Sequence, residues 1–264
     1  TLPSLFPLTV LKMVNLTLED NSLVNESGFA FVLYGIIMGS GIGNYELGNK
    51  LGKLGIQIIE KLDAKNIKCT SFFFFPCMNN HWREHAKLDL PYFLESIQAG
   101  MEYGDFLNAA YSTNHYNFQS LLMRKNLSEV NTGFAKFMPN FAKLGQNDPK
   151  KMFSLNYEMT LILQGQGKSL TEINGDIFNE KEIVPIWKEV KNATTLFNYY
   201  VNKLTLSYLF GSLIEAYNFA REAEPHAGGC FGMMFVPEHN LFDSLSCLGF
   251  LGDTELSEAD NSKY

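Results

Sequence analysis

Five consecutive residues have the spacing of a zinc hydrolase motif. His81 and His85 stand four residues apart with Glu84 between them, in the pattern H-x-x-E-H. On a helix, two histidines at this spacing share a face and can both bind Zn²⁺, while the glutamate activates a water molecule. Such a site needs a third protein ligand, for which Glu158 is the candidate. The pattern therefore indicates metal-dependent hydrolysis as one chemistry to test.

The surroundings of this pentapeptide favour a structural role instead. The flanking sequence has the apolar period of packed helices, whereas proteases with this motif combine helices with a sheet. In the structural interpretation the pentapeptide ends a helix, with Trp82 packed inward and Arg83 and Glu84 in solvent. We therefore expect no catalytic residue and no metal ion here. A metal-dependent hydrolase built on His81, Glu84 and His85 is the second hypothesis.

Two glycine-containing segments resemble phosphate-binding loops only in part. Gln166–Ser169 has the Gly-Lys-Ser end of a P-loop, but Ile162 stands where the first glycine is required, and no strand precedes it. Gly39, Gly41 and Gly43 follow a predicted helix, and their spacing suits a helix C-cap and a tight turn. The chain also has no Gly-x-Ser-x-Gly elbow and no kinase signature. We expect no cofactor and no ATPase, kinase or protease activity.

Aromatic side chains recur on the predicted helices, and most of them are expected to form the core between helices. His115, with polar and aromatic neighbours, is expected to be a hydrogen-bonded packing residue rather than a catalytic one. A minority of the aromatic residues could line a concave groove for a partner. The candidates for this groove are Tyr111, His115, Tyr116, Tyr199 and Tyr200. A small-molecule sensor with an aromatic pocket is the third hypothesis.

Apolar residues recur every three to four positions through most of the chain, which predicts helices rather than strands. Asp148-Pro149 and Asn179 with Glu182 resemble helix N-termini, the latter as a capping box. Residues 165–175 and 225–236 are predicted loops. The predicted helices cover 44–62, 67–82 with a kink at Pro76, 91–124 as a pair, 127–144, 148–163, 183–190, 193–210, 212–224 and 238–251.

The clearest helix pair is interrupted at Gly104-Asp105. Glycine suits a left-handed C-terminal cap, and aspartate caps the N-terminus of the next helix. Ala109 and Ala110 are small enough to let the two helices pack closely. Units of this size recur along the chain, and Gly211 divides a similar pair. The sequence thus predicts an all-α superhelical array of antiparallel helix pairs, tetratricopeptide-like, with residues 1–252 as one helical-repeat domain and 253–264 as a disordered acidic tail.

The composition limits which cellular compartment and which classes of partner we expect for this chain. A net charge of −7 and a pI near 5.3 argue against nucleic acid or an anionic membrane as partner. No apolar run is long enough for a membrane span. The four cysteines lack a Cys-x-x-Cys pair, and no signal peptide follows Thr1, so we expect free thiols in the cytoplasm and a piece of a larger protein.

Several short motifs follow one another in a characteristic order over residues 31–244. They are Phe31-x-x-Tyr34-Gly35, His81-Trp82-Arg83-Glu84-His85, Pro91-x-x-Leu94-Glu95, Gly100-x-Glu102-x-Gly104-Asp105 with Ala109-Ala110-Tyr111, Asn202-Lys203-Leu204, Tyr208-Leu209-Phe210-Gly211, and Phe235-Val236-Pro237 with Phe242-Asp243-Ser244. In this order the chain resembles the helical-repeat region of large bacterial multidomain signalling proteins. Those proteins typically also carry Ser/Thr-kinase-like, AAA/STAND ATPase, GAF and histidine-kinase domains.

The resemblance implies a tetratricopeptide-like superhelix that acts as a sensor or relay. It implies no catalytic residue in this chain, because catalysis in such proteins belongs to the neighbouring domains. The expected function is a non-catalytic interaction or regulatory module of a cytoplasmic signal-transduction protein. The expected partner is a protein or peptide, such as a flanking domain of the same polypeptide.

Overall fold

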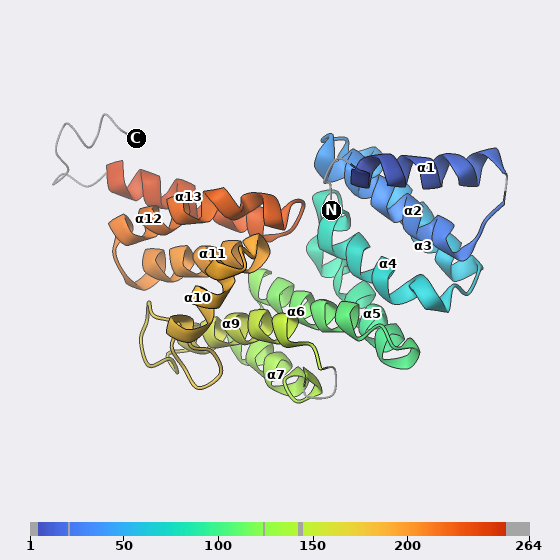
Figure 1. The fold of residues 1–264 in the computed structure, drawn as a ribbon. Helices are drawn as coiled ribbons and strands as arrows, with labels where there is room; N and C mark the ends of the chain where they lie inside the picture. Colours follow the sequence, from blue (N-terminus) through green and yellow to red (C-terminus); the bar gives the residue numbers. More distant parts are fainter. Residues whose placement is uncertain (1–4, 21, 124, 142–144, 252–264) are drawn as a thin grey trace. The chain divides into compact units, whose positions relative to one another are not determined.

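A computed structural model describes residues 5–20, 22–123, 125–141 and 145–251 (Figure 1). In these ranges the chain forms twelve α-helices and no β-sheet, and an isolated bridge joins Asn174 to Asn179. The predicted all-α class is confirmed, and helices mostly pack against their neighbours in sequence. The predicted tail, 253–264, and the end of the predicted helix 127–144 lie outside the described residues. None of the described helices is both long and apolar enough to cross a membrane.

The chain divides into two compact units. The first comprises Thr1–Lys125 with Ala135–Lys150, and the second comprises Asn126–Phe134 with Lys151–Tyr264. Helix α7 (Leu127–Phe137) contributes to both units. Because one helical array can contain two compact units, a single domain over residues 1–252 stays a prediction.

The first unit is built from sequential helix pairs, in which α1 packs on α2, α2 on α3, α4 on α5 and α5 on α6. Its core is aliphatic and aromatic, with Val10, Val32, Ile36, Ile59, Phe72 and Phe75 in one cluster. The α-helices are α1 (Leu5–Glu19), α2 (Asn25–Ile36), α3 (Tyr45–Lys61), α4 (Lys65–Met78), α5 (Leu90–Tyr103) and α6 (Phe106–Leu122). A π-helical turn, Ile37–Gly41, follows α2, and 3₁₀ turns at Asn80–Trp82 and Ala86–Leu88 precede α5.

Glycines let α2 and α3 approach each other closely. A Cβ atom at Gly35 would lie 2.6 Å from the carbonyl oxygen of Gly48, and one at Gly48 would lie 2.6 Å from that of Gly35. Gly28, Gly52 and Gly55 also face backbone or side-chain atoms at distances too short for a methyl group. At Gly28, Gly35, Gly48 and Gly55 a larger residue would have to separate the two helices, so this pair depends on glycine there. A larger residue at Gly52 would instead meet Phe75 and Asn79.

The pair α5–α6 forms as predicted. Gly104 ends α5 with a φ of 89°, and the Asp105 side chain accepts the N–H of Asn108 at 3.2 Å, which caps α6. Ala109 is fully buried, and a Cβ atom at Gly100 would lie only 2.7 Å from the Cβ of Ala109. The small residues therefore set the spacing of this pair.

The second unit has its most buried helix, α11 (Ala193–Phe210), against α10, α12 and α13. Ser212 caps α12 after the break at Gly211, as the sequence predicts. The predicted loop 225–236 is instead largely a 3₁₀ helix, Glu224–Cys230, which Thr194 Oγ1 holds through a hydrogen bond to the Gly229 carbonyl at 2.7 Å. The other helices are α9 (Asn147–Leu163), α10 (Glu180–Glu189), α12 (Leu213–Ala223) and α13 (Phe235–Leu251).

Candidate functional site

The pentapeptide His81–His85 does not lie on one α-helix. Helix α4 ends at Met78, His81 lies in a 3₁₀ turn, and His85 is the N-cap of the next 3₁₀ turn. The two histidines therefore do not share a helix face, which corrects the geometry assumed for a zinc motif. Nδ1 of His85 accepts the N–H of Lys87 at 3.0 Å, and Glu84 pairs with Lys53 at 2.7 Å.

His81 belongs to a buried polar network in the first unit. Its Nδ1 donates to the carbonyl oxygen of Pro76 at 2.9 Å and lies 3.6 Å from Oδ2 of Asp89, and both side chains are at most 1% exposed. The other oxygen of Asp89 accepts from Asn80 at 2.7 Å, and Asn80 accepts from Asn49 at 2.9 Å. Burial raises the pKa of Asp89, against the opposing effects of His81 and Asn80. The network ties α3 to the start of α5, where it has no exposed face for a substrate.

His115 lies in the core of the first unit, as the packing interpretation predicts. Its ring stacks on Phe93 with centroids 6.0 Å apart and meets the edge of Phe73 at 5.5 Å. Each ring nitrogen lies 3.7 Å from Sγ of Cys77. Burial, with a smaller contribution from nearby His81, lowers the pKa of His115 to about 3. The imidazole is therefore neutral at physiological pH.

The four groove tyrosines differ in burial. Tyr111 stacks on Phe73 and Tyr116 contacts Phe137 edge to face, and both are half-buried in the first unit. Tyr199 and Tyr200 are buried in the second unit, where the hydroxyl of Tyr199 donates to Glu180 at 3.1 Å. Burial, followed by the charge of Glu180, raises the pKa of Tyr199. Tyr111 and Tyr116 are therefore partly accessible to a partner, whereas Tyr199 and Tyr200 are part of the core.

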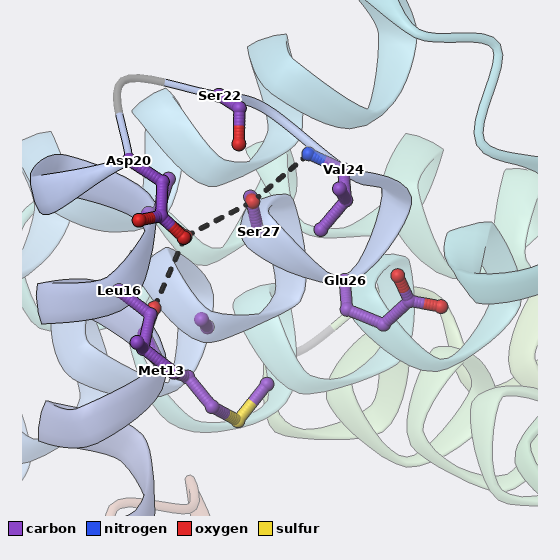
Figure 2. Close-up of a pocket in the computed structure, with 9 residues that line it drawn as sticks. Met13, Leu16, Asp20, Ser22, Val24, Glu26 and Ser27 are labelled. Atoms are coloured by element: carbon purple, nitrogen blue, oxygen red, sulfur yellow. Dashed lines mark hydrogen bonds between the residues drawn. The ribbon is translucent and has the colours of Figure 1, made fainter.

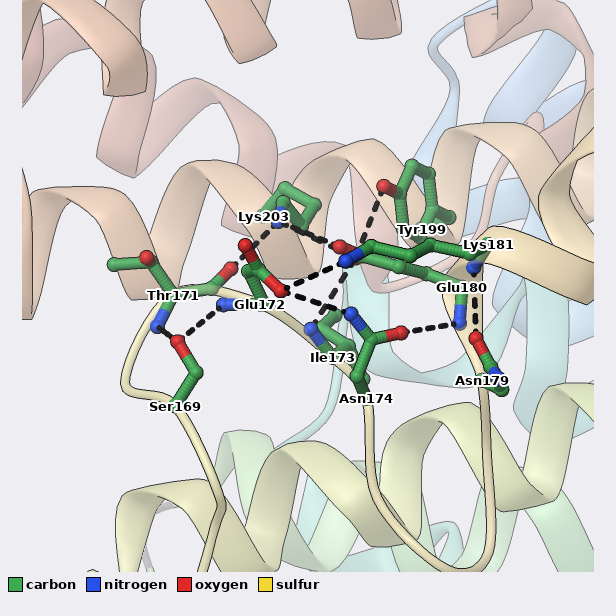
Figure 3. A network of polar contacts seen from close by, with 10 residues as sticks. All are labelled: Ser169, Thr171, Glu172, Ile173, Asn174, Asn179, Glu180, Lys181, Tyr199 and Lys203. Atoms are coloured by element: carbon green, nitrogen blue, oxygen red, sulfur yellow. Dashed lines mark hydrogen bonds and ion pairs between the residues drawn. The ribbon is translucent and has the colours of Figure 1, made fainter.

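The segment between α9 and α10, residues 164–179, is a long connection that polar contacts hold in place (Figure 3). Nζ of Lys203 on α11 donates to the carbonyl oxygen of Thr171 at 2.6 Å and pairs with Glu180 at 3.3 Å. Glu180 in turn accepts the N–H of Ile173 at 3.2 Å. The Lys203 and Glu180 side chains are only 7% and 12% exposed, and the ring of Phe219 lies 5.2 Å from the ammonium group. We call these two side chains, Lys203 and Glu180, the Lys203–Glu180 pair.

The far side of the same connection contacts Glu158, the third candidate zinc ligand. Burial raises the pKa of the Glu158 carboxyl, against the opposing effect of the backbone at Ile177 and Phe178. A Cβ atom at Gly175 would overlap that carboxylate. Lys168, of the sequence that resembles a P-loop, forms an exposed ion pair with Asp176 at 2.6 Å. Helix α9, rather than a strand, precedes it, so the backbone geometry of a phosphate cradle is not formed.

A pocket between α1 and α2 is a concave feature that sequence patterns did not indicate (Figure 2). Its volume is about 200 Å³. Aliphatic and small side chains line its floor, and Asp20 and Glu26 stand among its polar lining. The N–H of Val24 donates to Ser27 Oγ at 3.1 Å, and Ser27 Oγ lies 3.0 Å from Thr17 Oγ1, which donates to the Met13 carbonyl (Figure 2). We call this feature the α1–α2 pocket.

The exposed side of α1 carries several leucines among the polar residues Lys12, Asn15 and Glu19. Val10 and Val14 are buried on the inner side, where they pack with α2 and α3. Leu8, Leu11 and Leu18, in contrast, are 62%, 39% and 64% exposed. Their spacing of three and seven residues places them on one side of the helix. We call these three residues the α1 leucine stripe.

Comparison with known proteins yields no relative: no family model matches this chain, and no curated protein sequence matches it. Within the described ranges, no group of three or more His, Cys, Asp and Glu side chains lies close enough to hold a metal ion. The α1 leucine stripe and the α1–α2 pocket are the exposed parts of the candidate site.

Proposed function

We propose that this chain is a non-catalytic interaction module, a tetratricopeptide-like helical array within a bacterial multidomain signalling protein of the cytoplasm. The sequential pairing of helices supports this proposal, since arrays of such pairs provide extended binding surfaces. The protein partner is a flanking domain of the same polypeptide or a separate chain. In this role the array relays contact between domains and performs no chemistry itself.

The observation that carries the proposal is the α1 leucine stripe. A surface helix of a globular protein normally carries polar side chains on its exposed side. On α1 the three leucines of the stripe are exposed, although Val10 and Val14 already pack inward. Polar residues flank the stripe and do not cover it. Exposed apolar groups gathered on one element mark a surface for another protein. We infer that a partner covers this side of α1.

The buried polar groups support a structural rather than a catalytic role. Both oxygens of the Asp89 carboxylate face side chains of the same network, and Lys203 Nζ donates to a backbone carbonyl and to Glu180. These contacts make Asp89 and Lys203 connections between neighbouring elements. A catalytic group, in contrast, has to reach the reacting atoms of a substrate.

Site-specific photo-crosslinking tests the proposal. A photoreactive amino acid replaces Leu11 in the full-length protein in the cells that make it, and Glu189 on α10, which is also exposed, is replaced as a matched control. We expect a discrete adduct from position 11 that is absent at position 189. Replacement of Leu8 and Leu18 by serine should remove it with no loss of thermal stability. Equal labelling at both positions would show that the stripe faces solvent only.

A further inference from the structure

We infer that the α1–α2 pocket docks a lysine or arginine side chain presented by an amphipathic helix of the partner. The inference deepens the proposed function and rests on it, since it names the chemistry of the protein that the chain contacts. Four features support it: the size of the pocket, its aliphatic floor, its two unpaired carboxylates and its preformed shape.

The size of the pocket suits a side chain. Pockets for metabolites and cofactors usually measure about 300–1,000 Å³. The α1–α2 pocket, at about 200 Å³, falls below that range, but it accommodates one long side chain with a neighbouring methyl group. This difference favours part of a protein over a small-molecule ligand.

The carboxylates in the lining of the pocket favour a positively charged group. Asp20 and Glu26 are exposed and form no ion pair with the described residues. The nearest polar contact of Glu26 is a long hydrogen bond from Asn66 at 3.5 Å. Met13, Leu16 and Ala30 are the apolar part of the same lining. Lysine and arginine match this arrangement, because their methylene stems cover apolar surface while their heads reach a carboxylate.

The pocket is preformed. The hydroxyl groups of Thr17 and Ser27 are already satisfied by each other and by the backbone, so the wall does not have to rearrange when a side chain enters (Figure 2). Leu16 and Val24, which line the pocket, are exposed. They provide the aliphatic contacts that an amphipathic helix makes through residues three and four positions apart. A leucine next to the basic residue on the partner helix would fill this role.

Other occupants fit less well. The chain's own C-terminal residues carry Asp253, Glu255, Glu258 and Asp260 against one lysine, so two further carboxylates would repel them. A second copy of a chain with net charge −7 is also disfavoured by charge. A basic partner helix is the occupant that fits both the aliphatic floor and the two carboxylates of the pocket.

Fluorescence anisotropy with defined peptides tests the inference. The probes are two labelled amphipathic peptides of equal length and identical leucine pattern, one with lysine and one with glutamate at the polar positions. We expect the full chain to bind the lysine peptide and not the glutamate peptide. The variant Asp20→Asn with Glu26→Gln should bind the lysine peptide about tenfold more weakly, which corresponds to about 1.4 kcal/mol.

A matched control separates docking from general attraction to an acidic protein. The variant Glu189→Gln with Glu222→Gln removes the same two charges from exposed positions on α10 and α12. It should bind the lysine peptide as the native chain does. Equal weakening in both double variants would overturn the inference, and so would failure of the lysine peptide to bind. Photo-crosslinking at Leu11 decides the proposed function separately, because it does not depend on the charge of the partner.

Self-association is the remaining outcome. Sedimentation of the native chain and of the Asp20→Asn, Glu26→Gln variant would reveal dimers that depend on these carboxylates. Such dimers would assign the pocket to a second copy and contradict a basic partner helix. We expect both proteins to show the same molecular mass and the same melting temperature, since both substituted residues are exposed.

Discussion

His115 illustrates how burial controls an ionisable side chain. The ring lies between Phe93 and Phe73, near His81, and burial lowers its pKa to about 3, whereas an unfolded histidine titrates near 6.5. Below about pH 6.5 the unfolded chain binds a proton at this position that the folded chain does not bind. Folding stability from this group is therefore lost as the pH falls from about 6.5 to about 3.

We predict that His115→Phe will make the free energy of unfolding less sensitive to acid. The native chain should lose up to about 1.4 kcal/mol per pH unit from this group below pH 6.5. Urea unfolding of both proteins at pH 7, 5 and 4 measures the difference. Asp89 and His81 face the same region, and the raised pKa of Asp89 acts in the opposite direction, so the difference between the two proteins is the informative quantity. Parallel pH profiles would contradict the prediction.

The histidines of the pentapeptide lead to a prediction about metal content. We expect protein purified without added metal to contain no stoichiometric zinc, because His85 Nδ1 accepts the N–H of Lys87 and His81 donates to the backbone of Pro76. Elemental analysis of the native chain and of His85→Ala provides the measurement. Zinc at one equivalent in the native chain, lost in His85→Ala, would instead support the hydrolase hypothesis.

At the scale of elements, the α5–α6 pair depends on small side chains. We predict that Ala109→Leu with Ala110→Leu will destabilise the chain by about 1–3 kcal/mol, because both alanines are fully buried and Ala109 faces Gly100. Chemical denaturation measures the change. The same substitution at exposed Ala135 on α7 is the control and should have little effect. An unchanged stability in the double variant would place both alanines away from the neighbouring helix.

The connection between α9 and α10 depends on the Lys203–Glu180 pair. Removing Lys203 leaves a buried carboxylate without its cation, which typically costs about 3–5 kcal/mol. We predict that Lys203→Met will lower stability by this order and increase hydrogen exchange at the Ile173 amide, which donates to Glu180. Lys181→Met, at an exposed ion pair with Glu172, should change stability by less than about 1 kcal/mol. Similar effects from both variants would argue against a special role of the buried pair.

At the scale of the whole molecule, the prediction concerns activity. We expect the purified chain to turn over no ATP, because Lys168 forms an exposed ion pair with Asp176 and follows a helix. Lys168→Ala should therefore leave a phosphate-release assay unchanged. Turnover that survives contaminant controls and disappears in Lys168→Ala would defeat the non-catalytic proposal.

Local sequence signals predicted most of the helices from α3 onward, whereas α1 and α2 were not among the predicted ranges. The cap at Gly104-Asp105, the N-cap residue Asn179 and the break at Gly211 all act on backbone groups within about one helical turn. Apolar periodicity is equally local, and it located α3, α6 and α11 to within a few residues. Asn179 caps α10, but Glu182 bonds its side-chain amide rather than its backbone, so the reciprocal capping box was only partly correct.

Other features depended on tertiary partners and could not be read from spacing. The role of the glycines on α2 and α3 becomes visible only where Gly35 lies against Gly48. Likewise, His81 contacts Asp89 only because two short turns bring them together. The α1–α2 pocket and the exposure of the α1 leucine stripe likewise depend on which side of α1 packs against α2. By itself the sequence determined an all-α chain of capped, sequential helices, because those interactions are local. Only the tertiary structure decided which polar side chains are buried in contacts between helices and which surfaces are exposed to a partner. The reason is that burial depends on residues that are distant in sequence.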